Sequence, residues 1–182
     1  MFDELRKYVG TGKKVVLERR FPSNPRLNGY VLDVSDYLGV MHCFHDFMPD
    51  GYAVFRVGDI SDVRSGKYER HWDHMLSSEG LLYGLQRAPS IDLSRMRNAV
   101  ASISQQCEGM IIECEDEDIE DFYIGKVISI DDEGFEFTHF DGLGKWTTEP
   151  SWIDFDEITL IQLETPYLRT FWKYLVKPSQ TK

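Results

Sequence analysis

Hydrophobic residues recur along this chain with two periods, one typical of helices and one typical of strands. The segment from Phe2 to Val9 has apolar residues at helical spacing, and Gly10 and Gly12 follow it where a helix commonly ends. Short apolar or alternating segments come next and predict strands. These strands are expected at residues 15–17, 30–35, 38–47, 52–55 and 60–63, with Pro49-Asp50-Gly51 as a turn, and a helical segment holding Tyr68, Trp72 and Met75 follows them.

The second half of the chain repeats this order. A helix is expected from about Leu93 to Gln106, capped by Ser90 or Asp92. Strands are expected at residues 110–112, 123–130, 135–140, 152–155 and 158–163, and a closing helix holds Tyr167, Phe171 and Leu175. Phrases of sequence recur in the same order: Gly29–Val34 as Gly125–Ile130, Val40–Asp46 as Phe135–Asp141, and Asp59-Ile60 as Glu157-Ile158. Ordered matches of this kind predict a duplicated structural unit.

A short helix followed by five short strands predicts a small closed barrel, so the expected fold class is mainly β, with two tandem five-stranded barrels. Each barrel is preceded by a short helix and followed by a helical segment. Residues 1–75 form the first helix-plus-barrel repeat, residues 76–91 a connector, and residues 92–182 the second repeat. A barrel of roughly 60 to 70 residues is marginal alone, so the two are expected to pack together.

Composition narrows the class of protein. The 182 residues are 42% hydrophobic and 13% aromatic, which is enough for a folded core. No apolar run reaches the roughly 20 residues of a membrane-spanning helix, and the charged start of the chain does not resemble a secretory signal. Three cysteines, Cys43, Cys107 and Cys114, suit reduced thiols better than a disulfide framework. We therefore expect a cytoplasmic protein that does not enter a membrane.

The net charge of −11 is carried by the second half of the chain. Residues 1–91 hold 12 Lys and Arg against 12 Asp and Glu, whereas residues 92–182 hold 8 against 19. The second half would repel a nucleic acid, so RNA could approach only through the first half. This distribution favours a protein as the partner and disfavours RNA.

The order of a helix and five strands resembles the Sm-like barrel. Leu27–Val31, Asp50–Arg56 and Gly142–Trp146 resemble phrases of uncharacterised bacterial cytoplasmic proteins with tandem Sm-like barrels, and this resemblance spans nearly the whole chain. It implies a fold and no assigned activity. Sm proteins bind RNA through an Asp-x-apolar-Asn stretch and a later Arg-Gly or Cys-Gly pair. The loops here contain Asp46–Pro49 and Asp141–Gly144 instead, so no RNA-contacting residue is carried over.

Two loops at equivalent places in the repeats carry opposite charges. The acidic residues are Glu113, Glu115, Asp116, Glu117, Asp118, Glu120 and Asp121, and the basic residues are Arg19, Arg20 and Arg26. We predict that Glu115–Asp118 and the three arginines contact a partner. The alternative is a solvated hairpin that keeps a strand edge from pairing. The opposite charges would also allow two chains to dock head to tail, so a homo-oligomer is a further alternative.

An aromatic candidate accompanies these charges. Trp146, between Lys145 and Thr147, is the best candidate for an exposed aromatic that contacts a partner. Together with Lys13, Lys14 and the arginines it could stack on RNA. Most other aromatic residues on the strands alternate as core positions do.

The sequence lacks a catalytic, cofactor-binding or metal-binding motif with the required spacing. Gly10–Lys14 lacks the first glycine of a phosphate loop, and a Gly-x-Ser-x-Gly elbow is missing. His71 with His74, and His42 with His45, are loose pairs, whereas structural zinc needs four converging ligands. We therefore predict a protein that is not an enzyme and that holds no cofactor or metal.

The leading interpretation is a non-enzymatic binding or scaffolding protein whose acidic second half meets a partner. One alternative is an RNA-binding accessory protein that acts through the first barrel. Another is an immunity-type protein that blocks a basic toxin or nuclease. A neighbouring toxin gene would favour the immunity protein, and a neighbouring RNA-processing gene would favour RNA binding.

Overall fold

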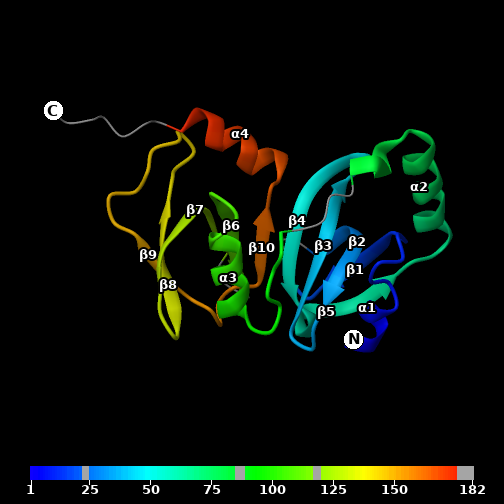
Figure 1. The fold of residues 1–182 in the computed structure, drawn as a ribbon, viewed down its shortest axis with the longest axis horizontal. Coiled ribbons are helices and arrows are strands. Elements are labelled where there is room, and N and C mark those ends of the chain that lie inside the picture. Colours follow the sequence, from blue (N-terminus) through cyan, green and yellow to red (C-terminus); the bar gives the residue numbers. More distant parts are fainter. Residues whose placement is uncertain (22–24, 85–88, 117–119, 176–182) are drawn as a thin grey trace.

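The strands that the structure describes form one ten-stranded antiparallel sheet that does not close into a barrel (Figure 1). The computed structural model describes residues 1–21, 25–84, 89–116 and 120–175. The strands are β1 (Val15–Arg19), β2 (Arg26–Val34), β3 (Leu38–His45), β4 (Met48–Arg56), β5 (Ile60–Arg64), β6 (Met110–Glu115), β7 (Glu120–Ile130), β8 (Gly134–His139), β9 (Ser151–Asp154) and β10 (Leu160–Leu163). The predicted mainly β fold is confirmed, whereas the closed barrels are corrected to an open sheet.

The pairing of β4 explains why the sheet stays open. The spatial order is β5-β1-β2-β3-β4-β10-β6-β7-β8-β9, so the first half (β1–β5) and the second half (β6–β10) each contribute five neighbouring strands in the same order. A closed barrel would need β4 to find its second partner within the first half. Instead, Tyr52–Phe55 of β4 pair with Leu160–Leu163 of β10 (Figure 1). This pairing gives the backbone groups along that edge of β4 their hydrogen-bond partners.

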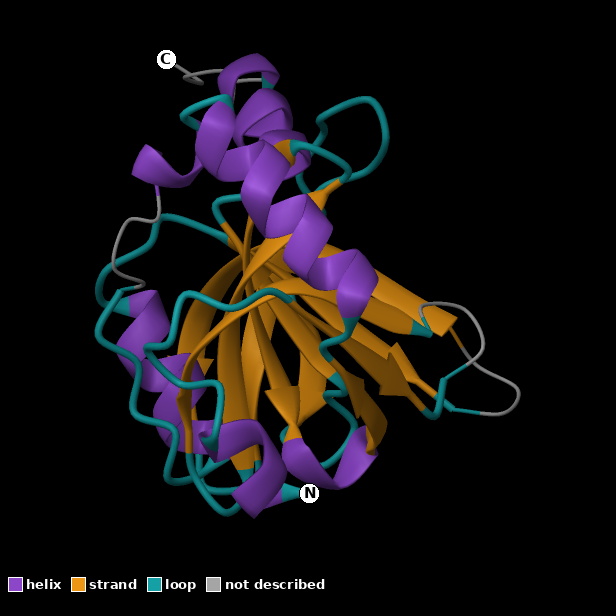
Figure 2. Ribbon diagram, turned by 90° about the vertical axis from the view of Figure 1, so that its right-hand side faces the viewer, coloured by secondary structure: helices purple, strands orange, loops and turns teal. Residues whose placement is uncertain are grey.

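Helices lie outside the strands (Figure 2). They are α1 (Phe2–Arg6), α2 (Lys67–Ser78), α3 (Met96–Ser104) and α4 (Pro166–Tyr174), with short 3-10 turns η1 (Val57–Asp59) and η2 (Leu81–Gly84). The predicted start of the third helix at Leu93 is corrected to Met96, because Asp92 accepts a hydrogen bond from the Ser94 N–H in the preceding turn. None of the described helices has the length and apolar character that a membrane crossing requires.

The turn before β4 also differs from its prediction. Pro49, Asp50 and Gly51 lie inside β4, and the chain reverses earlier, between His45 and Met48, which pair with each other. Asp46 adopts a left-handed φ of 51°, a conformation that aspartate tolerates better than most residues. A two-residue reversal therefore replaces the predicted Pro-Asp-Gly turn, and β4 is longer than the sequence pattern indicated.

The largest hydrophobic core lies under α3, where the two halves meet. Alternate residues of β4 point to opposite faces, so Val54 joins this core while Phe55 joins a second core beneath α1. Ile103 of α3 and Phe137 of β8 are fully buried in the shared core. The outer faces are covered by α2 in the first half and by α4 in the second half. Because β4 is buried on both faces, it is a central strand of the molecule.

Two glycines hold equivalent places in the halves. A Cβ atom on Gly29 would lie 1.9 Å from the carbonyl oxygen of His42, and one on Gly125 would lie 1.9 Å from the carbonyl oxygen of Thr138. In both halves the third strand approaches the second too closely for a side chain. Glycine is therefore required at both positions for the same steric reason.

The register of the second and third strands is also the same in both halves. An irregularity falls between Val31 and Asp33 in β2, and between Val127 and Ser129 in β7. Val40 pairs with Asp33 in the first half, and Glu136 pairs with Ser129 at the equivalent place in the second half. Val40 therefore corresponds to Glu136. The sequence alignment, which matches Val40 with Phe135, is corrected by one residue. The apolar pattern alone did not fix the offset.

Candidate functional site

A pocket of about 440 Å³ opens at the junction of the two halves. Its charged lining is mostly acidic, and the carboxylates are Asp59, Glu115, Asp116, Asp121, Asp156 and Glu157. Arg20 and Arg56 are the arginines among the described lining residues. The first half contributes Asp59 and both arginines, while the other five carboxylates come from the second half. The pocket exists only because the halves are held side by side.

A buried ion pair lies next to this pocket. The guanidinium of Arg19 contacts the carboxylate of Glu115, and the Arg19 side chain is 0% exposed. Glu115 also accepts a hydrogen bond from the Thr159 hydroxyl at 2.6 Å. Arg19 lies 5.1 Å from the centre of the Phe21 ring. One residue from each of the oppositely charged segments predicted from the sequence, Arg19 on β1 and Glu115 on β6, therefore pairs inside one chain.

Both arginines that line the pocket are engaged with the protein. Arg56 donates from Nε to the carbonyl oxygen of Ile158 at 2.7 Å and from Nη2 to that of Phe155 at 2.6 Å. Arg20 is 2.8 Å from Oδ1 of Asp59. Arg56 thus ties β4 to the segment before β10 and fixes one wall of the pocket.

Asp59 is the most deeply buried acid in this group. Only 3% of its surface is exposed, and its Oδ2 atom has no hydrogen-bond partner among the residues that the structure describes. Burial raises the pKa of the Asp59 carboxyl, and the nearby Arg20, Arg56 and Arg19 oppose this increase without cancelling it. Asp59 is therefore a buried carboxylate that pairs with Arg20 through one oxygen, while its other oxygen accepts no hydrogen bond from the described residues.

Aromatic side chains form another part of the pocket. Trp152 is 50% exposed, and its indole N–H donates to the Asp154 carboxylate. A Cβ on Gly134 would lie 2.8 Å from the Trp152 ring, so the absence of a side chain there lets the ring lie on the strand. Tyr123 donates to Asp121 at 3.1 Å, and burial raises its pKa to about 12. These contacts hold two aromatic rings at the acidic pocket.

The predicted acidic run is divided by the structure. Glu113 is buried and accepts a hydrogen bond from the Gln162 amide, and Glu115 is buried against Arg19. Asp116 and Asp121 are exposed and line the pocket. Glu117 and Asp118 lie outside the described residues. Two members of the run thus belong to the interior, and two belong to the candidate site.

The predicted basic cluster is divided as well. Arg19 is internal, while Arg20 and Arg26 are each 63% exposed, and Arg26 pairs with Glu18 at 2.9 Å. Lys14 is buried, contacts Asn28 and lies 5.1 Å from the centre of the Trp72 ring. Of the three predicted arginines, only Arg20 lines the pocket.

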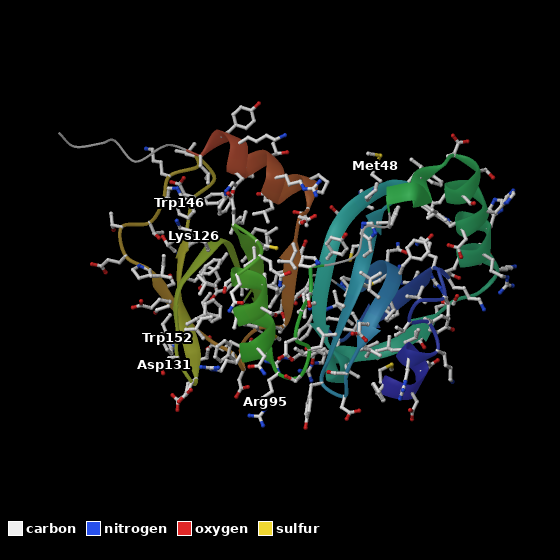
Figure 3. All side chains as sticks on the ribbon, viewed as in Figure 1. Met48, Arg95, Lys126, Asp131, Trp146 and Trp152 are labelled. Atoms are coloured by element: carbon white, nitrogen blue, oxygen red, sulfur yellow. The ribbon has the colours of Figure 1, made fainter. Side chains whose placement is uncertain are left out.

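Trp146 lies apart from those arginines. It is half-buried against Phe140 and Trp172, with Lys126 Nζ 5.4 Å from its ring centre. Figure 3 places Trp146 and Lys126 at the opposite end of the second half from Trp152. The basic residues and Trp146, which the RNA interpretation requires together, are therefore not brought to one surface.

The histidine and cysteine candidates are dispersed. Within the described ranges, no group of three His, Cys, Asp or Glu side chains is placed to hold a metal ion. His42 is buried and stacks on Tyr52 with ring centres 4.9 Å apart, while His71 and His74 are exposed on α2. Burial raises the pKa of Cys43 to about 12, which disfavours a reactive thiolate there.

Sequence reasoning missed Asp59 and Trp152 as site residues. Asp59 and Glu157 occupy matching places in the repeated phrases, and both line the pocket. The recurrence of an acid at these two places is a sequence signal that could have identified both residues as candidates, in addition to indicating the repeat. A scan against protein-family models, a search of curated proteins and a search of solved structures each found no match.

Proposed function

We propose that the protein is a non-enzymatic binding protein made of two Sm-like five-stranded units, and that it docks a basic segment of a protein partner at the junction pocket. The equal strand order of the halves and their equivalent glycines, Gly29 and Gly125, support the two units. The acidic second half supports a basic partner, because complementary charge speeds and orients association.

The lining of the junction pocket carries this proposal. Six carboxylates and two guanidiniums are found among its described lining residues, and two of the carboxylates, Glu115 and Asp59, are paired with Arg19 and Arg20. Arg56 is held by main-chain carbonyl groups and Arg20 by Asp59, so both positive charges already have partners. The remaining negative charge lies between the two halves, where Asp121, Asp156 and Glu157 are exposed. A cationic segment would neutralise this charge, whereas a nucleic acid would add to it.

Fluorescence anisotropy with defined probes tests the proposal. We expect a labelled peptide of alternating Arg and Gly to bind the full chain and to bind more weakly as salt increases. A Glu-Gly counterpart and a single-stranded RNA should not bind. The double variant Asp116→Asn, Asp121→Asn should weaken peptide binding, because both acids line the pocket.

The matched control is Asp33→Asn with Asp62→Asn, which neutralises two exposed acids of the first half outside the pocket lining. This variant should bind the Arg-Gly peptide as the wild type does. Failure of the wild type to bind the peptide would contradict the proposal. Preference for RNA over the peptide would replace it with the RNA-binding alternative.

A further inference from the structure

Strand β9 is a sheet edge whose counterpart in the first half is covered. Val40, which corresponds to Glu136, pairs with Val54 of β4. Glu136 pairs with Trp152 of β9, so Trp152 corresponds to Val54. On its other side Val54 pairs with Ile161 of β10, whereas β9 lies at the end of the sheet (Figure 1). The pairing of β4 with β10 therefore shows how a further strand can bind along the equivalent edge.

The backbone of β9 has hydrogen-bonding groups that face away from β8. The Phe155 N–H donates to the Glu133 carbonyl oxygen at 3.0 Å, and antiparallel strands alternate bonded with non-bonded pairs. Ile153 therefore bonds to β8, whereas the backbone groups of Trp152 and Asp154 point outward. None of the described residues bonds to the N–H or C=O of Trp152, or to the N–H of Asp154. These groups are available to an added strand.

The charges along β9 favour a basic strand. Residues 149–157 contain four carboxylates and neither lysine nor arginine. Edge strands are often protected by charged side chains, especially lysine, which would repel a basic strand. Along β9 the charge is negative instead, so it repels an acidic segment and attracts a basic one.

The two faces of β9 differ in polarity. Directly opposed residues of an antiparallel pair place their side chains on the same face, so a residue opposite Trp152 would lie beside a ring that is 50% exposed. Trp152 lines the acidic pocket, and a cationic side chain would be favoured there. Ile153 is buried on the other face, as Phe55 is where Leu160 lies opposite it in β10. The edge therefore fits a segment in which basic and apolar residues alternate.

We propose that an extended basic segment of a partner protein adds to the sheet as an antiparallel strand along β9, with a basic residue opposite Trp152 and apolar residues on either side of it. This inference rests on the proposed function, since it names the conformation in which the basic partner binds and the strand that receives it. Strand β9 has four residues, so the added strand is short. Its main-chain hydrogen bonds supply affinity, and its side chains supply specificity.

Fluorescence anisotropy with three labelled peptides tests strand addition. The probe is a capped heptapeptide that alternates valine and arginine, and its twins carry N-methyl groups either on every arginine or on every valine. An arginine opposite Trp152 turns its N–H toward β9, so N-methylarginine should weaken binding to the full chain by about tenfold or more. The valine N–H groups face away from β9, so the N-methylvaline twin should bind as the probe does.

Hydrogen exchange of the wild-type amides locates the bound strand. A saturating concentration of the probe should slow exchange at Trp152 and Asp154 by about tenfold or more, because each N–H gains an acceptor. The Ile153 amide already faces β8 and serves as the internal reference, whose exchange should change little. This measurement requires no substitution in the protein.

Two substitutions of Trp152 isolate the contribution of the backbone. Trp152→Pro removes an N–H that faces away from β8, a change that edge strands tolerate, and should weaken probe binding by about tenfold or more. Trp152→Val introduces the residue type found at Val54 and keeps the N–H, so it should lose only the contribution of the ring, about two- to fivefold. Since both variants lack the ring, the difference between them reports the main-chain hydrogen bond.

The outcomes separate this inference from the proposed function. Equal binding of the probe and its N-methylarginine twin, unchanged exchange at Trp152, or binding of the Arg-Gly peptide without binding of the probe would overturn strand addition and leave acidic docking intact. Failure of both the probe and the Arg-Gly peptide to bind would contradict the proposed function itself. If the chain alone sediments as a dimer or larger species and Trp152→Pro restores the monomer, a second copy covers β9 and the partner segment is overturned.

Discussion

The first and second halves of the molecule share the same order of strands but differ in net charge and in the length of their fourth strand. Both arrange five strands in the same order, and both require a glycine where the second strand meets the third. Yet β4 has nine residues and pairs on both sides, whereas its counterpart β9 has four and lies at the end of the sheet. The longer strand, β4, connects the two halves through β10, whereas the shorter strand, β9, is an edge strand of the sheet.

The charge difference has a structural use at this joint. By register, Arg20 in the first half stands where Glu115 stands in the second, and Glu115 is neutralised by Arg19 of the first half. Part of the opposed charge therefore links the halves. The remainder, in Asp116, Asp121 and Asp156, surrounds the pocket. Some charged residues of the protein thus pair across the two halves, while others line the pocket, where a ligand could bind.

The largest effect is expected at the buried ion pair. Arg19→Met should lower the free energy of unfolding by about 3–5 kcal/mol, because Glu115 would lose its arginine inside the protein. Arg26→Met removes an exposed pair and should cost less than about 1 kcal/mol. Urea unfolding of the two variants measures the contrast. Similar losses would show that the junction pair is no more important than a surface pair.

The equivalent glycines give a second, smaller effect. Gly29→Ala and Gly125→Ala should each cost about 3 kcal/mol, since the new Cβ overlaps a carbonyl oxygen of the neighbouring strand. Gly58→Ala and Gly142→Ala, in open space, are the controls and should stay within about 0.5 kcal/mol. Thermal and urea unfolding report both. A large loss in one half only would contradict the shared steric requirement.

The smallest effect concerns pH and has opposite signs in two acids. Burial raises the folded-state pKa of Asp59 above 3.8, so its contribution to stability is present below that value and is lost as pH rises through the folded pKa. Burial also pushes the pKa of Glu69 upward, but hydrogen bonds from Gly66, its own backbone N–H and Arg64 hold it below 4.5. Its contribution is present above that value and is lost as pH falls through the folded pKa.

Unfolding of the two neutral variants at pH 3 and pH 7 checks these signs. Relative to wild type, Asp59→Asn should gain stability as pH rises, and Glu69→Gln should lose it. Curves that remain parallel to wild type for Asp59→Asn would show that nearby positive charge compensates the ionised carboxylate fully in the folded protein.

Local patterns predicted much of the fold and little of the site. The order of helices and strands follows from short-range apolar spacing, so it was accessible from the sequence. The pairing of β4 with β10 joins residues about a hundred positions apart, and no local pattern distinguishes it from barrel closure. Arg19 was expected on the surface, although it alternates with Val15 and Leu17 on the buried face of β1, a signal the sequence did contain.

The site itself depends on separate elements that converge. Asp59 ends η1, Trp152 lies on β9, and Tyr123 lies on β7. Each is unremarkable in its own segment, and only the placement of the halves brings them together. The acidic run includes Asp116 and Asp121, which line the pocket, but it also includes Glu113, whose place in the interior follows from strand pairing.

The joint between the halves has a consequence for biosynthesis. Strand β4 is complete at Arg56, but the strand that covers its edge begins only at Leu160. While the ribosome adds the intervening chain, the nascent protein presents uncovered backbone donors and acceptors that another nascent copy could capture. Slow translation or crowded polysomes should therefore promote exchange of β10 between molecules, producing intertwined dimers by the same hydrogen bonds that close the monomer.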